Sequence, residues 1–113
     1  MQRLIKFRAW DKVLERWLSE GEVNAYTLEA LNIPGSVVFT QFSGFSDKKK
    51  RLIFEDDIID DGDKCWRVIF SEGTFVAHGP GRWKPLRAIT SHMVPHLEVI
   101  GNIHENPRMV LSR

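Results

Sequence analysis

The sequence predicts a mainly β protein, built as an antiparallel barrel or sandwich. Segments rich in β-branched and aromatic residues recur about every ten residues, and turn formers such as those at 60–63 separate them. The chain has 113 residues, of which 42% are hydrophobic and 27% charged, as in an ordinary soluble globular protein. We therefore expect one domain over residues 1–113, with an N-terminal lobe at 1–46 and a barrel lobe at 47–107 as the finer division.

Composition narrows the class of protein. The single cysteine, Cys65, allows no internal disulfide and is typical of a reducing cytosol, so we expect a cytoplasmic protein. No stretch approaches the roughly 20 apolar residues of a membrane span. No apolar run follows the basic start of the chain, which argues against a secretory signal.

Charge is distributed unevenly along the chain. Residues 1–63 hold 9 basic and 12 acidic side chains, a net −3, whereas residues 64–113 hold 7 basic and 3 acidic side chains, a net +4. The overall charge of +1 argues against indiscriminate binding to nucleic acid. The asymmetry still leaves room for a local anion site in the second half.

The first quarter of the chain predicts a β-hairpin. Residues 2–9 indicate an opening strand that ends in a turn at Asp11 and Lys12. Residues 13–18 suit either the second arm of a hairpin or one turn of helix. The short connection and the aromatic residues at both ends favour the hairpin arm.

One short helix is expected next. Residues 20–22 are interpreted as a break, and Asn24 is placed to cap a helix over residues 25–31 that Pro34 stops. The β-branched and aromatic stretch at 37–42 then predicts a strand.

The middle of the chain predicts a connection followed by strands. Residues 43–51 are polar and charged, and residues 52–59 are interpreted as strand around an acidic centre. The alternation over 65–70 predicts a strand with Trp66, Val68 and Phe70 on one face. A tight turn at Glu72 and Gly73, with glycine at positive φ, joins it to a strand at 74–78.

Two further strands are predicted after a loop at residues 79–81. Residues 86–94 indicate a strand that Pro85 and Pro95 confine to an edge or a short piece. Residues 97–103 are predicted as the last strand.

Three stretches carry a resemblance to a known family. They are Lys6-Phe7-Arg8-Ala9-Trp10-Asp11, Gln41-Phe42-Ser43-Gly44-Phe45-Ser46-Asp47 and Ile100-Gly101-Asn102-Ile103-His104-Glu105-Asn106-Pro107. In this order they resemble the YopX family of small bacteriophage and prophage proteins, whose biochemical role is not established. The resemblance implies a mostly β fold, a small SH3-like barrel in the second half, and homo-oligomerisation. Residues 20–36 have no counterpart that we can match.

The chain departs from the family pattern at several positions. Ser43 stands where threonine is usual, and Phe54 and His104 stand where tyrosine is common. Asp56 stands where glycine is usual, which puts a tight glycine turn there in question.

Two basic clusters are the candidate binding residues for an anion or a partner. The first follows the Gly-Pro-Gly loop and includes a tryptophan whose ring could stack on a base. The second is a run of four cations that suits either phosphate contact or a charged hairpin tip. These candidates are Arg82, Trp83, Lys84 and Arg87 in the first cluster, and Lys48, Lys49, Lys50 and Arg51 in the second.

Catalytic and metal-binding patterns fail when their spacing is checked. The acidic run at 55–63 lacks the ligand order of a calcium-binding loop. If the loop is counted from Asp57, Ile59 and Val68 stand at positions where the pattern requires an oxygen ligand. His92 and His96 have helical metal spacing, but Pro95 lies between them. We therefore expect no metal, no cofactor and no catalytic site.

The leading hypothesis is a phage-type β-barrel binding protein without catalytic activity, which engages an unknown host or phage protein in the bacterial cytoplasm. A second hypothesis is a nucleic-acid or nucleotide-binding barrel. A third is a structural homo-oligomer, because four tryptophans and seven phenylalanines in 113 residues could exceed what one small core hides. None of the three involves a membrane.

Overall fold

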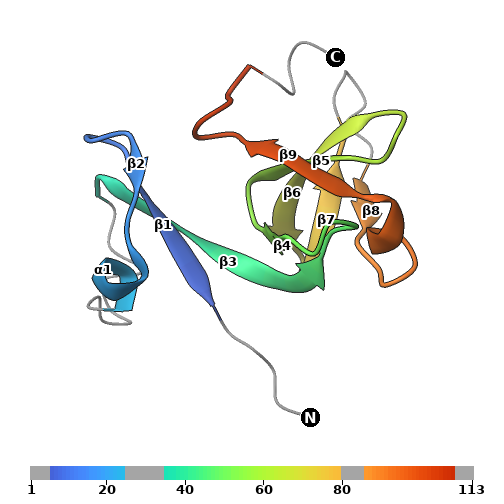
Figure 1. Cartoon of the computed structure of the whole chain (residues 1–113), viewed down its shortest axis with the longest axis horizontal. Coiled ribbons are helices and arrows are strands. Elements are labelled where there is room, and N and C mark those ends of the chain that lie inside the picture. Colours follow the sequence, from blue (N-terminus) through green and yellow to red (C-terminus); the bar gives the residue numbers. More distant parts are fainter. Residues whose placement is uncertain (1–5, 25–34, 80–85, 109–113) are drawn as a thin grey trace. The chain divides into compact units, whose positions relative to one another are not determined.

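The computed structural model describes residues 6–24, 35–79 and 86–108, and Figure 1 shows its ribbon. The expected mainly β class is confirmed: 51% of the described residues are in strands, and the antiparallel sheets include a half-barrel. The elements are β1 (Phe7–Asp11), β2 (Arg16–Trp17), α1 (Glu20–Asn24), β3 (Val37–Ser46), β4 (Leu52–Phe54), β5 (Asp57–Asp60), β6 (Cys65–Ser71), β7 (Thr74–His78), β8 (Leu86–Ala88), the 3-10 helix η2 (Val94–His96) and β9 (Glu98–Asn102).

The chain divides into two compact units, residues 1–42 and 43–113. The strands form a four-stranded sheet in the order β2-β1-β3-β4 and a five-stranded sheet in the order β8-β7-β6-β5-β9. The long strand β3 contributes residues to both units.

The predicted N-terminal hairpin is confirmed. β1 and β2 pair with Trp10 opposite Trp17, and the two rings meet edge to face with centroids 5.1 Å apart. The Arg8 guanidinium lies 4.2 Å from the Trp17 ring centroid on the same hairpin. Cross-strand aromatic pairs and cation–π contacts each stabilise a short hairpin that backbone pairing alone would leave marginal.

The predicted break at residues 20–22 is wrong, because α1 begins there. The Ser19 hydroxyl accepts the Glu22 N–H at 3.2 Å, and the Glu22 carboxylate accepts the Ser19 N–H at 2.8 Å. This reciprocal pair is a capping box, and it outweighs the helix-breaking tendency of Gly21. The expected helix over 25–31 lies outside the described residues.

β3 extends beyond the predicted strand at 37–42, so the expected connection at 43–46 is wrong. Gly44 sits inside the strand at φ +92°, and a Cβ there would meet nothing within 4 Å. Glycine is therefore favoured here by the positive φ angle and not by crowding around the residue. It lets the strand continue through a bend that an ordinary residue would resist.

The segment 52–59 is not a continuous strand. Residues 55 and 56 form a turn between β4 and β5, with Asp56 at φ +73°. The tight turn thus persists although an aspartate occupies the usual glycine position. Aspartate tolerates this backbone region better than most residues, and its side chain finds partners that are described below.

The core of the second unit lies on one face of the five-stranded sheet. The β6–β7 turn has both Glu72 and Gly73 at positive φ, 51° and 82°, as a type I′ hairpin turn requires. The predicted facing of Trp66 and Val68 is confirmed, while Phe70 at the end of the strand is 49% exposed. The cluster comprises Ile53, Ile59, Trp66, Val68, Phe75, Ala77, Ile89 and Leu97.

The last third of the chain is more broken than predicted. The strand expected over 86–94 ends at Ala88, and Pro95 lies within η2. β8 is an edge strand, as the flanking prolines indicated. β9 contains a bulge at Ile100, because Ile58 on β5 pairs with Gly101 whereas the next residue, Ile59, pairs with Val99. The alternation of side chains along β9 is interrupted there.

A buried carboxylate joins the β3–β4 turn to β9. The Asp47 side chain is fully buried, and its oxygens accept the N–H groups of Lys49 at 2.9 Å, Arg51 at 2.8 Å and Val99 at 2.9 Å. A backbone bond from the Lys48 N–H to the Leu97 carbonyl at 2.9 Å reinforces the contact. The outer edge of β9 is thereby capped by the turn that follows β3.

Removing the Asp47 carboxylate should destabilise the protein. We expect Asp47→Ala to lower the free energy of unfolding by about 3 kcal/mol, because three N–H groups lose a charged acceptor. Asp63→Ala removes the same charge from an exposed side chain and should change stability by less than about 0.5 kcal/mol. Urea unfolding measures both, and equal effects would contradict the assignment.

Acid should weaken the same contact. Burial alone would raise the pKa of Asp47, but the N–H groups of Val99, Arg51 and Lys49 hold that pKa below the usual 3.8. A lowered folded pKa means that this stability is present above pH 3.8 and is lost as pH falls below that value through the folded pKa. Asp47→Asn should therefore show a shallower loss of stability over that acid range, and an unchanged pH profile would refute the idea.

Candidate functional site

The cationic turn, residues 48–51 between β3 and β4, surrounds one carboxylate. Glu98 on β9 receives Lys48 Nζ at 3.6 Å, Lys49 Nζ at 3.1 Å and Arg51 Nη2 at 3.0 Å. Hydrogen bonding from Lys49 chiefly lowers the pKa of Glu98. Asp47 and Glu98, rather than the acids of 55–63, are therefore the counter-ions of this turn.

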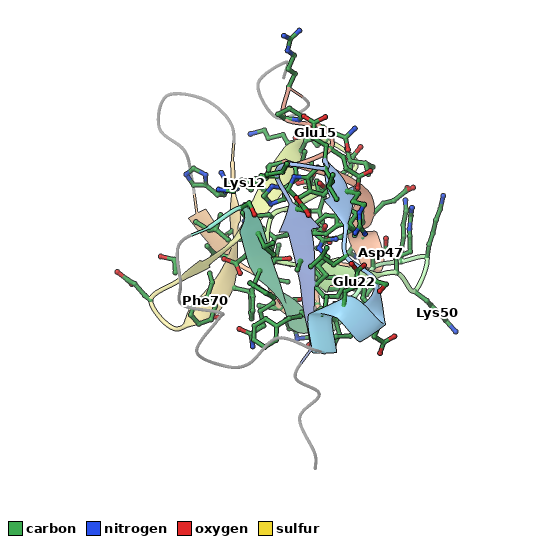
Figure 2. All side chains as sticks on the ribbon, turned by 90° about the vertical axis from the view of Figure 1, so that its left-hand side faces the viewer. Lys12, Glu15, Glu22, Asp47, Lys50 and Phe70 are labelled. Atoms are coloured by element: carbon green, nitrogen blue, oxygen red, sulfur yellow. The ribbon has the colours of Figure 1, made fainter. Side chains whose placement is uncertain are left out.

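Lys50 differs from its three neighbours. Its backbone adopts φ +64° at the tip of the turn, and its side chain is exposed. Figure 2 shows Lys50 extending into solvent, whereas Asp47 lies closer to the ribbon. No ion pair of Lys50 is found among the described residues. The turn thus presents one cation outward and holds three against Glu98.

Arg87 is the only member of the first basic cluster within the described residues. It lies on β8, and its guanidinium stands 5.6 Å from the centroid of the Trp66 ring. The Trp66 indole N–H in turn donates to Asp61 at 2.9 Å. This arrangement lets Arg87 cover one edge of the core.

Arg87 and the cationic turn lie at different edges of the five-stranded sheet. Arg82, Trp83 and Lys84 lie outside the described residues. Arg87 is on β8, one edge of the five-stranded sheet, and the cationic turn contacts β9, the opposite edge. The described residues thus supply two separate basic positions.

The acidic run has local structural partners. Asp57 accepts the Phe54 N–H at 2.8 Å, Asp60 accepts the Gly62 N–H at 2.7 Å, and Asp61 accepts the N–H groups of Asp63 and Lys64. Within the described ranges, no three His, Cys, Asp or Glu side chains are grouped to hold a metal ion. Cys65 is fully buried, as expected for a packed thiol.

A second polar cluster connects two turns. The Asp56 carboxylate receives Arg67 Nη2 at 3.0 Å and lies 3.1 Å from His104 Nε2. The Ile103 N–H also donates to the Asp56 carbonyl at 3.0 Å. Two departures from the family pattern, Asp56 for glycine and His104 for tyrosine, are thus in contact with each other. Sequence spacing gave no sign of this pair, because 48 residues separate its members.

Asn102 positions His104 for that contact. The Asn102 side-chain oxygen accepts the N–H groups of His104 at 3.1 Å and Glu105 at 2.9 Å. Its amide nitrogen donates to the Glu105 carboxylate at 2.8 Å. This local bonding forms the turn after β9, as expected of an asparagine at such a position.

The tip of the β1–β2 hairpin carries exposed aliphatic side chains that the sequence did not single out. Val13 is 74% exposed and Leu14 is 61% exposed. The Asp11 carboxylate accepts both of their N–H groups, at 2.9 and 3.0 Å. Two adjacent aliphatic residues directly after the Asp11–Lys12 turn signal were the available clue.

Comparisons with known proteins identify a family and a fold. A family model described as YopX protein matches residues 21–110. The crystal structure of protein EF1440 from Enterococcus faecalis is similar, with a TM-score of 0.68 and 23% identity over 96% of this chain and 99% of that one. At this identity the likeness shows the fold alone. No curated protein matches the chain.

The matched residues refine the resemblance found from motifs. They include most of the stretch 20–36, for which no counterpart was expected, and they begin after the motif at 6–11. No helix among the described residues has the length and apolar character needed to cross a membrane.

The Asp56 cluster predicts a graded series of stabilities. Asp56→Asn keeps a residue that tolerates φ +73° but removes the charge that faces Arg67 and His104, so we expect a loss of about 1 kcal/mol. Asp56→Ala should lose about 1 kcal/mol more, because alanine tolerates this backbone region poorly. Thermal unfolding tests the order, and equal losses in both variants would argue against a backbone contribution.

Proposed function

Because the chain belongs to the YopX family, we propose that it is a non-catalytic binding module whose partner is another protein, from the host or from a phage, in the bacterial cytoplasm. The observation that carries this proposal is the hairpin tip, Val13 and Leu14, which presents two neighbouring aliphatic side chains to solvent. The phage setting rests on the family resemblance alone.

The hairpin tip is held in place by its own contacts. Asp11 binds both backbone N–H groups of the tip, and the Lys12 N–H donates to the Ser36 carbonyl at 2.7 Å. Behind it, Arg16 and Glu22 form an ion pair at 3.0 Å. An ordered tip loses little conformational entropy on binding, so more of its apolar burial appears as affinity.

The chemistry of the tip favours a protein partner with an apolar recess. Single exposed aliphatic residues are common on protein surfaces, but two adjacent ones on a protruding turn form a compact apolar knob. Full burial of each side chain would contribute roughly 1.5–3 kcal/mol. Lys12 and Glu15, labelled in Figure 2, are exposed charges of opposite sign at the rim of this knob.

We also propose that the half-barrel of the second unit closes as the small SH3-like barrel that the family resemblance implies. Strands β5 to β8 follow one another as an antiparallel meander. The chain then returns through η2 and pairs β9 with β5, which leaves β8 and β9 as the two edges that would meet in a closed barrel. Such a return favours a closed sheet and supports a rigid platform.

The absence of catalysis and of a cofactor is part of the proposal. It is supported by the use of potentially reactive groups in local structure. Asp47, Asp57 and Asp61 bind backbone N–H groups, and the Cys65 thiol is buried. These structural roles of the carboxylates and the thiol fit a scaffold that presents binding surfaces to a partner.

Replacing the tip residues should abolish partner binding without unfolding the protein. We expect Val13→Ser with Leu14→Ser to lose the proteins that the unaltered chain captures from bacterial lysate, while the midpoint of thermal unfolding stays the same. The matched control, Lys64→Gln with Glu72→Gln, alters one exposed lysine and one exposed glutamate outside this turn and should retain capture.

Identical sets of captured proteins for all three forms would reject the hairpin tip as the binding surface. Light scattering of the unaltered chain tests the alternative that the protein is a homo-oligomer. A dimer that becomes monomeric on replacement of Val13 and Leu14 would mean that the tip binds a second copy of this chain.

A further inference from the structure

We propose that the cationic turn is a second binding surface, which contacts the phosphate backbone of nucleic acid without reading its sequence, and that Glu98 is a built-in competitor for it. The turn and the hairpin tip have no residue in common. The turn can therefore fail its test while the proposed protein-binding function stands, and the reverse also holds.

The first observation is the convergence of cations on one oxyanion. Lys48, Lys49 and Arg51 come from one short turn, and their charged atoms lie 3.6, 3.1 and 3.0 Å from the oxygens of Glu98. The four cations of the turn outnumber its two counter-ions, Asp47 and Glu98, so the turn keeps an excess of positive charge. This geometry can hold an oxyanion, and Glu98 occupies the anion position in the free protein.

The second observation is the accessibility of these groups. The side chains of Lys48, Lys49 and Arg51 are 47, 61 and 50% exposed, and that of Glu98 is 27% exposed. Ion pairs between such exposed groups contribute little to stability, so exchanging Glu98 for an incoming phosphate costs little. The backbone of the turn is fixed by Asp47, so the cations need not be gathered on binding.

The third observation separates phosphate from other anionic partners. An acidic peptide would offer the group that Glu98 already supplies within the chain, so exchange would gain little. A nucleic-acid duplex brings one charge per about 1.7 Å of its axis and releases counterions when cations bind it. A membrane surface is disfavoured because, in the described residues, the exposed large apolar side chains are Val13, Leu14 and Phe70, and none is in this turn.

Glu98→Gln is the informative variant because it removes the competitor and keeps the fold. Glu98 lies opposite Asp60 on β5, so its neutralisation also relieves a like-charge contact across the two strands. The variant should therefore remain folded, which thermal unfolding verifies.

The experiment is fluorescence anisotropy with a short labelled DNA duplex, at about 50 and about 200 mM salt. Three phosphate contacts predict that affinity falls about 40-fold between these conditions. Glu98→Gln should bind about two- to fivefold more tightly than the unaltered chain. Lys48→Gln with Lys49→Gln should weaken binding about tenfold, and the charge-matched control Lys12→Gln with Lys64→Gln should not. A second duplex of different sequence should bind equally well.

Three results would overturn the proposal. One is no binding of duplex by folded Glu98→Gln at the lower salt concentration. Another is an affinity that the Lys48→Gln and Lys49→Gln replacements leave unchanged. The third is binding to polyglutamate, or to vesicles of anionic phosphatidylglycerol, that equals or exceeds binding to the duplex.

Discussion

The carboxylate of Asp47 is the constraint on which the second unit depends. It lies at the end of β3 and accepts N–H groups from its own turn and from Val99 on β9, which is 52 residues away in the chain. A local turn is thereby made part of the long-range sheet. The same bonds fix the backbone from which Lys49 and Arg51 reach Glu98, so the fold and the cationic turn share one support.

Elements with a clear hydrophobic period or a glycine turn could be predicted from the sequence. Elements that are fixed by side-chain hydrogen bonds could not. The β6 strand and the Glu72–Gly73 turn followed from alternation and from glycine chemistry. The α1 helix was missed because its signal is the short Ser19–Glu22 capping box rather than a hydrophobic period. The turn at Asp56 was missed because nothing in the local sequence shows that Arg67 and His104 stabilise it.

The candidate sites show the same division. A run of four cations is visible in any sequence, but the counter-ion Glu98 becomes apparent only when β9 lies beside the turn. The exposure of Val13 and Leu14 depends on Asp11, which binds the tip backbone and turns both side chains outward. Composition revealed which residues were available, whereas side-chain bonds, local at Asp11 and long-range at Glu98, determine how these residues are presented.

The role of Asp47 can be tested most directly by amide hydrogen exchange, followed residue by residue in the unaltered protein and in Asp47→Asn. If Asp47 holds the turn against β9, the Val99 and Arg51 amides are strongly protected in the unaltered protein. In the variant they should lose that protection ahead of the amides that bond β6 to β7. Exchange of the Val99 amide at the rate of an unprotected peptide in the unaltered protein would show that Asp47 does not hold β9.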